Sequence, residues 1–418
     1  MSEWLAPSLA SAVVAALLLG VSCGLLGTIV VVRRMALTGD MISHAVLPGV
    51  VAGLAWSETR NPLVVLACAM AAGMAGSVAF TAILRHTRLK PDAALALVLS
   101  VFFALGIAMI SRLQPSGVHA FLYGQVAAID RNDLALLLTA GLFTVVAVPV
   151  GFHLLRMVSF DPMFSRIVGL PVRVVETGFY LLLAATIVIA MQAVGVVLVT
   201  AMLVTPAAAA RYFTRSLSVM AALACLFGAL GGVAGVWIST LRGGLPTGPL
   251  MALAVTLVFV LSAATGPRHG ILPQWLRRRR ERIRIRGEDI LKHLWQIEEN
   301  DGQPAVRTPD ELEGVFGPSH RALRRFGLLG LLEHDGGRVR LTGSGRRRAT
   351  QLVRAHRLWE RYLTERAAYK SDHVHDTAER LEHWIDEPRR RMLADQLGQP
   401  TEDPHGSPIP PDDKEVAR

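Results

Sequence analysis

Apolar residues fill most of the first two thirds of the chain in long stretches, and polar residues dominate the remainder. A membrane-spanning helix needs about 20 apolar residues, because each residue rises about 1.5 Å and the hydrocarbon core is about 30 Å thick. Stretches of this length predict eight or nine transmembrane helices. They lie near residues 8–32, 41–57, 62–84, 92–111, 134–152, 174–192, 194–213, 217–240 and 247–265.

The charged residues divide the chain at the same place. Only 8 of the 33 acidic residues lie in residues 1–266. The chain as a whole carries a net charge of +10. Basic residues gather between the predicted spans, for example at Arg33 and Arg34 and from Arg268 onward. Because positively charged loops stay in the cytoplasm, we expect a multi-pass membrane protein whose C-terminal part is cytoplasmic.

Four segments follow from this division. Residues 1–266 are expected to form a membrane domain, and residues 267–286 a basic linker whose arginines contact anionic lipid, with nucleic-acid binding as the alternative. Residues 287–410 are expected to form a soluble domain, and residues 411–418 a tail.

The soluble part begins with signals for short helices and a hairpin. Thr308, Pro309 and Glu311 form a capping box with proline at the first helical position. The segment SHRALRRFGLLGLL predicts a second helix that Gly330 ends, and EHDGGRVRLT predicts a β-hairpin. Helix, turn, basic helix and hairpin is the order of a winged helix-turn-helix. The candidate DNA-binding residues, for which solvated surface is the alternative, are Arg321, Arg324 and Arg325.

Carboxylates and imidazoles recur at helical spacing in the second half of the soluble part. The spacing i, i+4, i+7 and i+8 places side chains on one helix face, and His375, Glu379, Glu382 and His383 follow it. Carboxylates with imidazoles, in the absence of thiolates, suit Mn(II), Fe(II) or Zn(II). The pattern therefore predicts a metal site in a mainly α-helical domain. The candidate ligands are His356, Glu360, His375, Glu379, Glu382 and His383.

A second candidate site lies inside a predicted span, in MALTGDMISHAVLPGVVAG at residues 35–53. Asp40 and His44 are four residues apart, so a helix places them on one face. Ionisable groups within a span cost several kcal/mol and indicate a function. The alternative is an interfacial position, because the pair follows Arg33 and Arg34 closely.

Small residues mark places where the predicted spans approach one another. GVSCG at 20–24 and GALGGVAG at 228–235 predict close helix packing. Pro206 lies within a predicted span and favours an interrupted helix, as in many transporters.

The soluble part resembles the iron- and manganese-dependent repressors of the DtxR/MntR type, whose fold includes a metal-binding and dimerisation domain. The resemblance rests on VRLTGSGRRRATQLVRAHRLWERYL, HDTAERLEHWI and DPHGSPIP. It implies that Asp289 joins the six candidate ligands. The glutamate at position 379 is similar to the manganese-dependent branch of the family, because the iron sensors carry a cysteine there. Lys292 departs from the pattern, because it stands where that branch carries an acid. Its ammonium group would replace one cation electrostatically.

The membrane part resembles the permease subunits of manganese, zinc and iron ABC importers. The resemblance rests on RRMALTGDMISHAVLPGVVAG, FDPMFSRIVGLPVR, AVGVVLVTAMLVTPAAAAR and GLPTGPL. It implies a bacterial cytoplasmic membrane, a second permease subunit and an extracytoplasmic metal-binding protein. It also implies that Asp40 and His44 bind the transported metal, and that residues 161–169 form a coupling helix for an ATPase. The coupling residues named by this match are Asp161, Phe164, Arg166 and Gly169.

The chain lacks a G-x-x-x-x-G-K-[ST] phosphate loop, so ATP hydrolysis is expected on a separate subunit and the chain itself is not expected to be an enzyme. We therefore expect a polytopic α-helical permease that imports Mn, or else Zn or Fe, with a cytosolic metal sensor. Two alternatives remain. One is a membrane-tethered, metal-dependent transcription regulator, and the other is an ion-driven secondary transporter.

Overall fold

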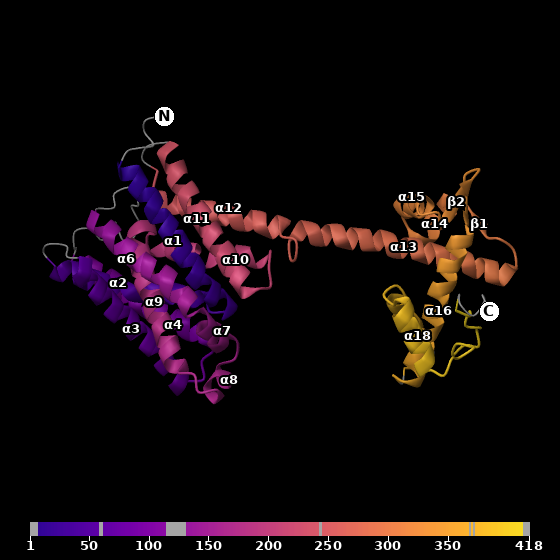
Figure 1. The fold of residues 1–418 in the computed structure, drawn as a ribbon, viewed down its shortest axis with the longest axis horizontal. Coiled ribbons are helices and arrows are strands. Elements are labelled where there is room, and N and C mark those ends of the chain that lie inside the picture. Colours follow the sequence, from indigo (N-terminus) through magenta and orange to yellow (C-terminus); the bar gives the residue numbers. More distant parts are fainter. Residues whose placement is uncertain are drawn as a thin grey trace. The chain divides into compact units, whose positions relative to one another are not determined.

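The computed structural model describes residues 7–57, 62–113, 131–241, 245–367, 369–370 and 373–412. The chain divides into two compact units, Met1–Gln274 and Trp275–Arg418. Figure 1 labels their elements. Each unit is described below by itself.

The first unit consists of helices, and each of the nine predicted apolar stretches is helical in it. The helices are α1 (Pro7–Val32), α2 (Ala36–Trp56), α3 (Pro62–His86), α4 (Pro91–Leu113), α6 (Arg131–Val150), α7 (Phe152–Phe160), α8 (Pro162–Ile167), α9 (Val172–Val194), α10 (Val196–Arg211), α11 (Leu217–Leu241) and α12 (Thr247–Thr265).

The number of spans agrees with the lower of the two predicted values. Seven helices of the described part are long and apolar enough to cross a membrane. Helices α6 and α7, bent by 65° at Gly151, bring the count to eight if the pair forms one broken span. Helix α10 has 16 residues and a length of about 24 Å. It is too short to cross by itself, and it packs against α1, α11 and α12.

Glycines bring α1 and α11 into backbone contact, as the small-residue pattern predicted. A β-carbon on Gly20 would overlap the carbonyl group of Gly228, and a β-carbon on Gly24 would overlap that of Ala224. Helices without side chains at the crossing point approach closely and gain van der Waals contact along their length. The two segments that the sequence singled out therefore meet each other.

The interruption between helices falls at a glycine rather than at the proline that favoured it. Helix α10 continues through Pro206. Gly195 separates α9 from α10 with φ of +90°, a backbone conformation that side chains disfavour. The expectation of an interrupted helix is thus met, but Pro206 was the wrong position.

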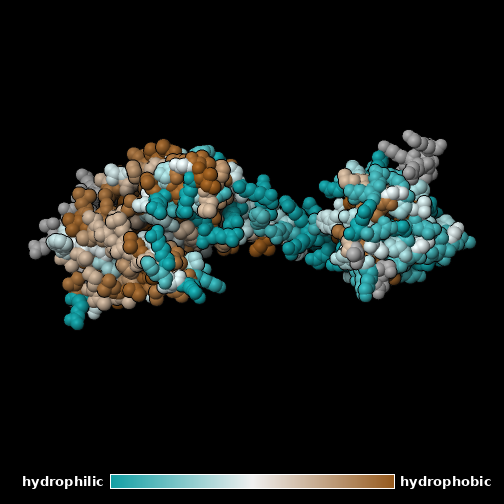
Figure 2. All heavy atoms as spheres, turned by 90° about the horizontal axis from the view of Figure 1, so that it is seen from below, coloured by the Kyte–Doolittle hydropathy of each residue, from teal (hydrophilic) through white to brown (hydrophobic). Residues whose placement is uncertain are grey.

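The face of the first unit that Figure 2 shows is largely apolar. On α4, for example, Leu97, Val101 and Leu105 occupy successive turns of one face and are about half exposed. Such a face suits lipid or another membrane helix, because hydrocarbon solvates apolar side chains without cost.

In its described residues, the second unit has five short or medium helices and a small sheet after the long helix α13, which begins in the first unit. The basic segment predicted as a linker is helical from Ile271 onward and continues into the soluble unit without a break. The elements are α13 (Ile271–Asp301), β1 (Val306–Arg307), α14 (Pro309–Phe316), α15 (His320–Leu328), β2 (Leu332–Asp335), β3 (Arg338–Leu341), α16 (Gly343–Glu365), α17 (His375–Glu382) and α18 (Glu387–Gln396).

The predicted winged helix-turn-helix is confirmed. Thr308 and Glu311 form both hydrogen bonds of the capping box at the start of α14. The sheet has the order β1-β3-β2 with antiparallel pairs, and the β2–β3 turn contains Gly336 and Gly337, both with positive φ. Gly330, with φ of +67°, follows the end of α15 as expected. The core includes Ile290, Leu323, Phe326 and Val339.

Candidate metal centres

Asp40 and His44 lie together on α2, as their spacing predicts. Asp40 Oδ1 is 3.6 Å from His44 Nε2, and the two side chains are 34% and 14% exposed. From Met41 to Val51, His44 is the only residue that is not buried. The exposed line of α2 therefore passes through Asp40 and His44, while α3, α4 and α10 pack against the helix.

The His44 ring packs against an aromatic ring of α4. Its edge meets the ring of Phe103 on α4, with centroids 4.9 Å apart. Its Nδ1 atom is buried and has no hydrogen-bond partner among the described residues. A buried polar atom without a partner costs about 1–3 kcal/mol, so it needs a water, an ion or another chain.

The segment Asp161–Gly169 forms a short exposed helix. Asp161 caps α8 by accepting a hydrogen bond from the backbone N–H of Phe164 at 2.8 Å. Gly169, with φ of +84°, follows its C-terminal end. Phe164 is 51% exposed and Ile167 is 81% exposed, and Arg166 is also exposed. An apolar surface with a basic residue on a rigid turn is a suitable surface for another protein.

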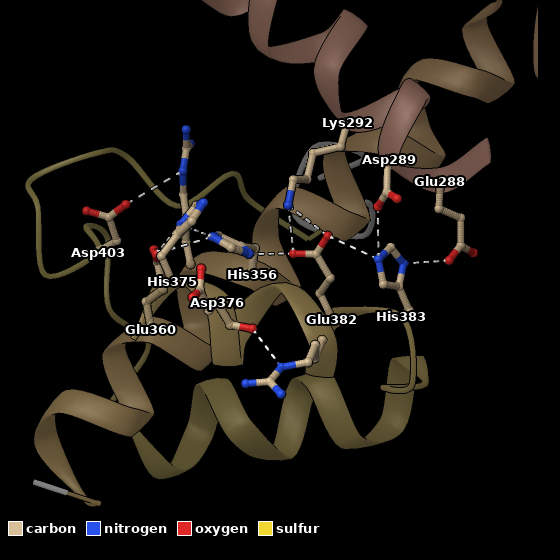
Figure 3. A network of polar contacts seen from close by, with 12 residues as sticks. Glu288, Asp289, Lys292, His356, Glu360, His375, Asp376, Glu382, His383 and Asp403 are labelled. Carbon is tan, nitrogen blue, oxygen red and sulfur yellow. Dashed lines mark hydrogen bonds and ion pairs between the residues drawn. The ribbon is translucent and has the colours of Figure 1, made fainter. Parts of the chain in front are cut away.

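The soluble candidate ligands converge from three helices (Figure 3). Helix α16 carries His356 and Glu360, α17 carries His375 and Glu382, and α13 passes beside them. Their ligand atoms form two groups, each with all its atoms within 4.8 Å of one another. We call the first the His–Glu–His triad, and its members are His356, Glu360 and His375. We call the second, with its neighbours, the α13 cluster, and its members are Glu288, Asp289, Lys292, Glu382 and His383.

The His–Glu–His triad is compact. His375 Nδ1 lies 3.0 Å from both Glu360 Oε1 and His356 Nε2, and His356 Nε2 lies 3.2 Å from Glu360 Oε1. His356 and Glu360 are almost fully buried, whereas the His375 side chain is 61% exposed. One carboxylate and two imidazoles that share an opening to solvent fit a divalent transition metal.

The α13 cluster already contains cationic groups. Lys292 Nζ donates to Glu382 Oε1 at 2.8 Å and to Glu382 Oε2 at 3.0 Å, and Glu382 also accepts from His356 Nδ1. His383 Nδ1 donates to Glu288 Oε2 at 2.8 Å. His383 Nε2 lies 3.1 Å from Asp289 Oδ1, but without hydrogen-bond geometry, so this oxygen has no hydrogen bond among the described residues.

These contacts shift the protonation equilibria of the histidines. Burial lowers the pKa of His383, but the contacts with Asp289 and Glu288 outweigh burial and raise the pKa to about 9. Burial likewise lowers the pKa of His356, whereas its contacts with Glu360 and Glu382 raise it, and the net direction is upward. Burial raises the pKa of Glu360, but its contacts with His356 and His375 bring the pKa below its usual value.

Not every predicted ligand joins these groups. Glu379 is exposed and belongs to neither group of the described residues. Glu288 was not predicted, although it contacts His383 and lies 2.6 Å from Arg348. Its place beside Asp289 and one turn before Lys292 was the available signal, because i and i+4 share a helix face.

The candidate DNA-binding arginines of α15 are all exposed. Arg321 also lines a groove with three arginines of the second unit's part of α13, which are Arg279, Arg282 and Arg286. A basic surface of this kind attracts phosphate groups.

Residues 6–266 match the ABC 3 transport family. The chain belongs to this family. Residues 342–411 match the iron dependent repressor metal-binding and dimerisation domain. The chain is therefore a permease of the ABC 3 transport family with a C-terminal repressor-like domain.

Curated relatives cover either the membrane unit or the whole chain. The manganese transport system membrane protein MntC of Bacillus subtilis is 36% identical over 68% of this chain and 67% of its own length. The zinc transport system membrane protein TroC of Treponema pallidum is 36% identical over 65% of this chain and 94% of its own length. A probable metal transport system membrane protein of Chlamydia pneumoniae is 30% identical over 97% of both chains, so its length accommodates both units.

A solved structure resembles the membrane unit. PsaBC from Streptococcus pneumoniae, in complex with Fab, has 29% sequence identity and a TM-score of 0.58, and the match covers 66% of this chain and 96% of that chain.

Proposed function

We propose that this permease is the membrane subunit of an ATP-driven importer of divalent transition metal, with Mn(II) as the first candidate substrate and Zn(II) or Fe(II) as others. Relatives named for manganese and for zinc transport support this substrate class. In this proposal residues 1–266 form the permease domain, 267–286 a basic linker, 287–410 a sensor domain and 411–418 a tail, of which 413–418 lie outside the described residues.

The exposed line of α2 is the observation that carries the proposal. Asp40 and His44 offer a carboxylate and an imidazole beside the buried stretch Met41–Val51 of α2, in which His44 is the one residue that is not buried, and His44 Nδ1 lacks a partner among the described residues. Two protein ligands leave most coordination positions to water or to a second permease subunit. Such incomplete coordination allows the ion to leave as readily as it enters.

Energy for transport would come from a separate ATPase docked on α8. The exposed side chains of Phe164 and Ile167 supply apolar contact, and Arg166 supplies a charge for orientation. Asp161 and Gly169 fix the ends of this helix, so a movement of the ATPase would be transmitted to α7 and α9. An extracytoplasmic metal-binding protein would deliver the ion on the other side of the membrane.

The soluble unit would sense cytosolic metal. In this proposal the ion is held by residues of the predicted set, and its binding alters the packing of α16 and α17 and thereby reduces import in metal-replete cells. The compact His–Glu–His triad supports a metal-binding role, because its donor atoms are already 3.0–3.2 Å apart.

Uptake of ⁵⁴Mn(II) by cells that express the chain with its ATPase tests the transport function. We expect Asp40→Asn and His44→Gln to reduce uptake more than about tenfold, which corresponds to roughly 1.4 kcal/mol of lost interaction with the ion. Asp92→Asn and His86→Gln, at the ends of α4 and α3, are matched controls that should transport normally. Normal uptake by both α2 variants would refute the permeation site.

The same assay separates the ATP-driven importer from a secondary transporter. An ATPase with its phosphate-loop lysine replaced should abolish uptake, and Phe164→Cys in the permease should cross-link to the ATPase. Uptake that persists without any ABC ATPase would favour ion-driven transport instead.

DNA binding is a second candidate function, supported by the winged helix and the exposed arginines of α15. Fluorescence anisotropy of the full chain in nanodiscs with duplex DNA tests it. Binding that weakens steeply with salt and is lost in Arg324→Ala, Arg325→Ala would support this function, whereas no binding at 50 mM salt would refute it.

A further inference from the structure

Lys292 occupies the interior of a cluster where a metal ion would otherwise be expected. It is 6% exposed, and its ammonium group contacts both carboxylate oxygens of Glu382, which is 2% exposed (Figure 3). A buried carboxylate needs a cation, because the loss of hydration otherwise disfavours its charged form. Lys292 supplies that cation from the protein itself.

The remaining acids of the α13 cluster are also matched by basic groups of the chain. Glu288 lies between Arg348, at 2.6 Å, and His383, at 2.8 Å. The opposite nitrogen of His383 faces Asp289 at 3.1 Å. These contacts connect α13 to α16 and α17 without an added ion.

Glu382 also orients the ring that faces the other site. Since a carboxylate only accepts, its contact with His356 requires a proton on Nδ1. With that proton fixed on Nδ1, loss of the other proton leaves the lone pair on Nε2, which faces Glu360 and His375. A carboxylate behind a ligating histidine is the usual arrangement that fixes the ligand tautomer.

The spacing of the His–Glu–His triad suits one face of an octahedron. Metal–ligand bonds of about 2.1 Å at right angles hold neighbouring donor atoms about 3.0 Å apart. The triad's separations of 3.0–3.2 Å are close to this value. Its exposed member, His375, leaves the other coordination positions open to water.

We propose that Lys292 is a built-in cation of the α13 cluster, so that the soluble unit takes a single divalent metal ion, bound by the His–Glu–His triad. Lys292 and Glu382 act as positioning residues in this assignment, and Asp289 and His383 are not ligands. The inference rests on the proposed sensor function. It assigns three predicted ligands, His356, Glu360 and His375, to the metal, and it assigns Asp289, Glu382 and His383 to the cluster that the chain neutralises by itself, whereas Glu379 belongs to neither group of the described residues.

Mn(II) binding to the purified full chain tests the assignment. The count is made by electron paramagnetic resonance of free Mn(II) in an Asp40→Asn, His44→Gln background, so that it reports the soluble unit. We expect one ion per chain, none after His375→Ala, and one after Asp289→Asn. Lys292→Glu should bind two ions, and adding Asp289→Asn should return it to one. Lys370→Glu, an exposed lysine of the same unit, is the matched control and should bind one.

Two measurements stand even if Lys292→Glu fails to fold. Pulsed electron paramagnetic resonance should detect two imidazole nitrogens on bound Mn(II), unchanged in His383→Gln. Amide exchange of α17 should be slow in EDTA, because Lys292 holds this helix to α13, and it should become fast in Lys292→Met.

The outcomes distinguish this assignment from the sensor function on which it rests. Two ions in the background chain, or loss of one ion in Asp289→Asn, would overturn the single-ion assignment while leaving metal sensing intact. A folded Lys292→Glu chain that still binds only one ion would also overturn it. No bound ion in the background chain would overturn the sensor function itself.

Discussion

The membrane site on α2 and the clusters of the soluble unit use the same side-chain types in opposite ways. On α2, Asp40 and His44 are 3.6 Å apart, and His44 Nδ1 has no partner among the described residues. In the soluble unit, by contrast, the single carboxylate of Glu382 has two hydrogen-bond partners, Lys292 and His356.

The difference teaches what each site is built to do. The α13 cluster pairs its own charges, so it holds α17 against α13 whether or not an ion is bound. In the proposed sensor function, a metal-dependent change of packing therefore arises at the His–Glu–His triad. In the proposed transport function, the pair on α2, with few ligands and an unsatisfied atom, would bind the ion loosely and release it. Four predictions test this contrast.

The largest expected effect is the loss of the soluble unit's internal ion pair. Glu382→Gln leaves Lys292 buried without its carboxylate and should reduce the unfolding free energy by about 3–5 kcal/mol. Asp40→Asn should change stability by less than about 0.5 kcal/mol, because its side chain is partly exposed and makes no comparable pair. Chemical unfolding of the full chain, followed by amide exchange in each unit, measures both. Equal losses in the two variants would remove the contrast.

A pH titration should reveal the same internal pairing. The pKa of His383 is raised to about 9, so its contribution to stability is full below the unfolded value of about 6.5 and is lost as the pH rises through 9. We expect α17 of the metal-free chain to lose on the order of 2 kcal/mol of protection over this range. Amide exchange, corrected for its intrinsic pH dependence, provides the measurement. In His383→Gln this slope should disappear, and a slope that persists would assign it to other groups.

Adding a ligand to α2 should make the sparse site behave like the dense one. Leu37 lies one turn before Asp40 and is 47% exposed, so Leu37→His offers a third donor. We expect more Mn(II) retained on the purified chain and uptake reduced about tenfold, because tighter binding by roughly 1.4 kcal/mol slows release. Leu63→His, at the start of α3, should alter neither quantity. Faster uptake in Leu37→His would show that binding, and not release, limits transport.

The smallest expected effect is on regulation. His375→Ala removes an exposed member of the triad and should leave the fold intact while cells accumulate about threefold more manganese, a coupling of under 1 kcal/mol. Total cellular manganese at growth-limiting and replete supply measures it. Thr377→Ala, two residues further along α17, serves as control. Accumulation equal to that of the unmodified chain would separate metal binding by the soluble unit from control of import.

The spans and the winged helix were predictable because they depend on local patterns. Apolar length located the membrane helices, and capping and turn residues such as Thr308 and Gly336 located the soluble elements. The position of the helix interruption was not predictable in this way. Pro206 removes one backbone hydrogen bond, and α10 continues despite this loss. Gly195, in contrast, adopts a positive φ that residues with side chains avoid, and the helix ends there.

The ligand set was predicted only as a shared helix face. Spacing placed His375, Glu379 and Glu382 on one stripe of α17, but it did not say where neighbouring helices pass. His375 meets α16 and Glu382 meets α13, whereas Glu379 remains exposed between them. The pairing of Glu288 with His383 depends on residues 95 positions apart, which no local spacing encodes.

The contact between Gly20 and Gly228 has a genetic consequence. When a larger residue at one position damages a contact, a smaller residue at the partner position often restores it. Neither glycine has a smaller replacement, so a Gly20→Ala lesion has no reciprocal suppressor at Gly228. A selection for revertants should therefore return the original glycine, or substitutions elsewhere that move α1 or α11 as a whole. Compensating changes at the partner glycine should not be found.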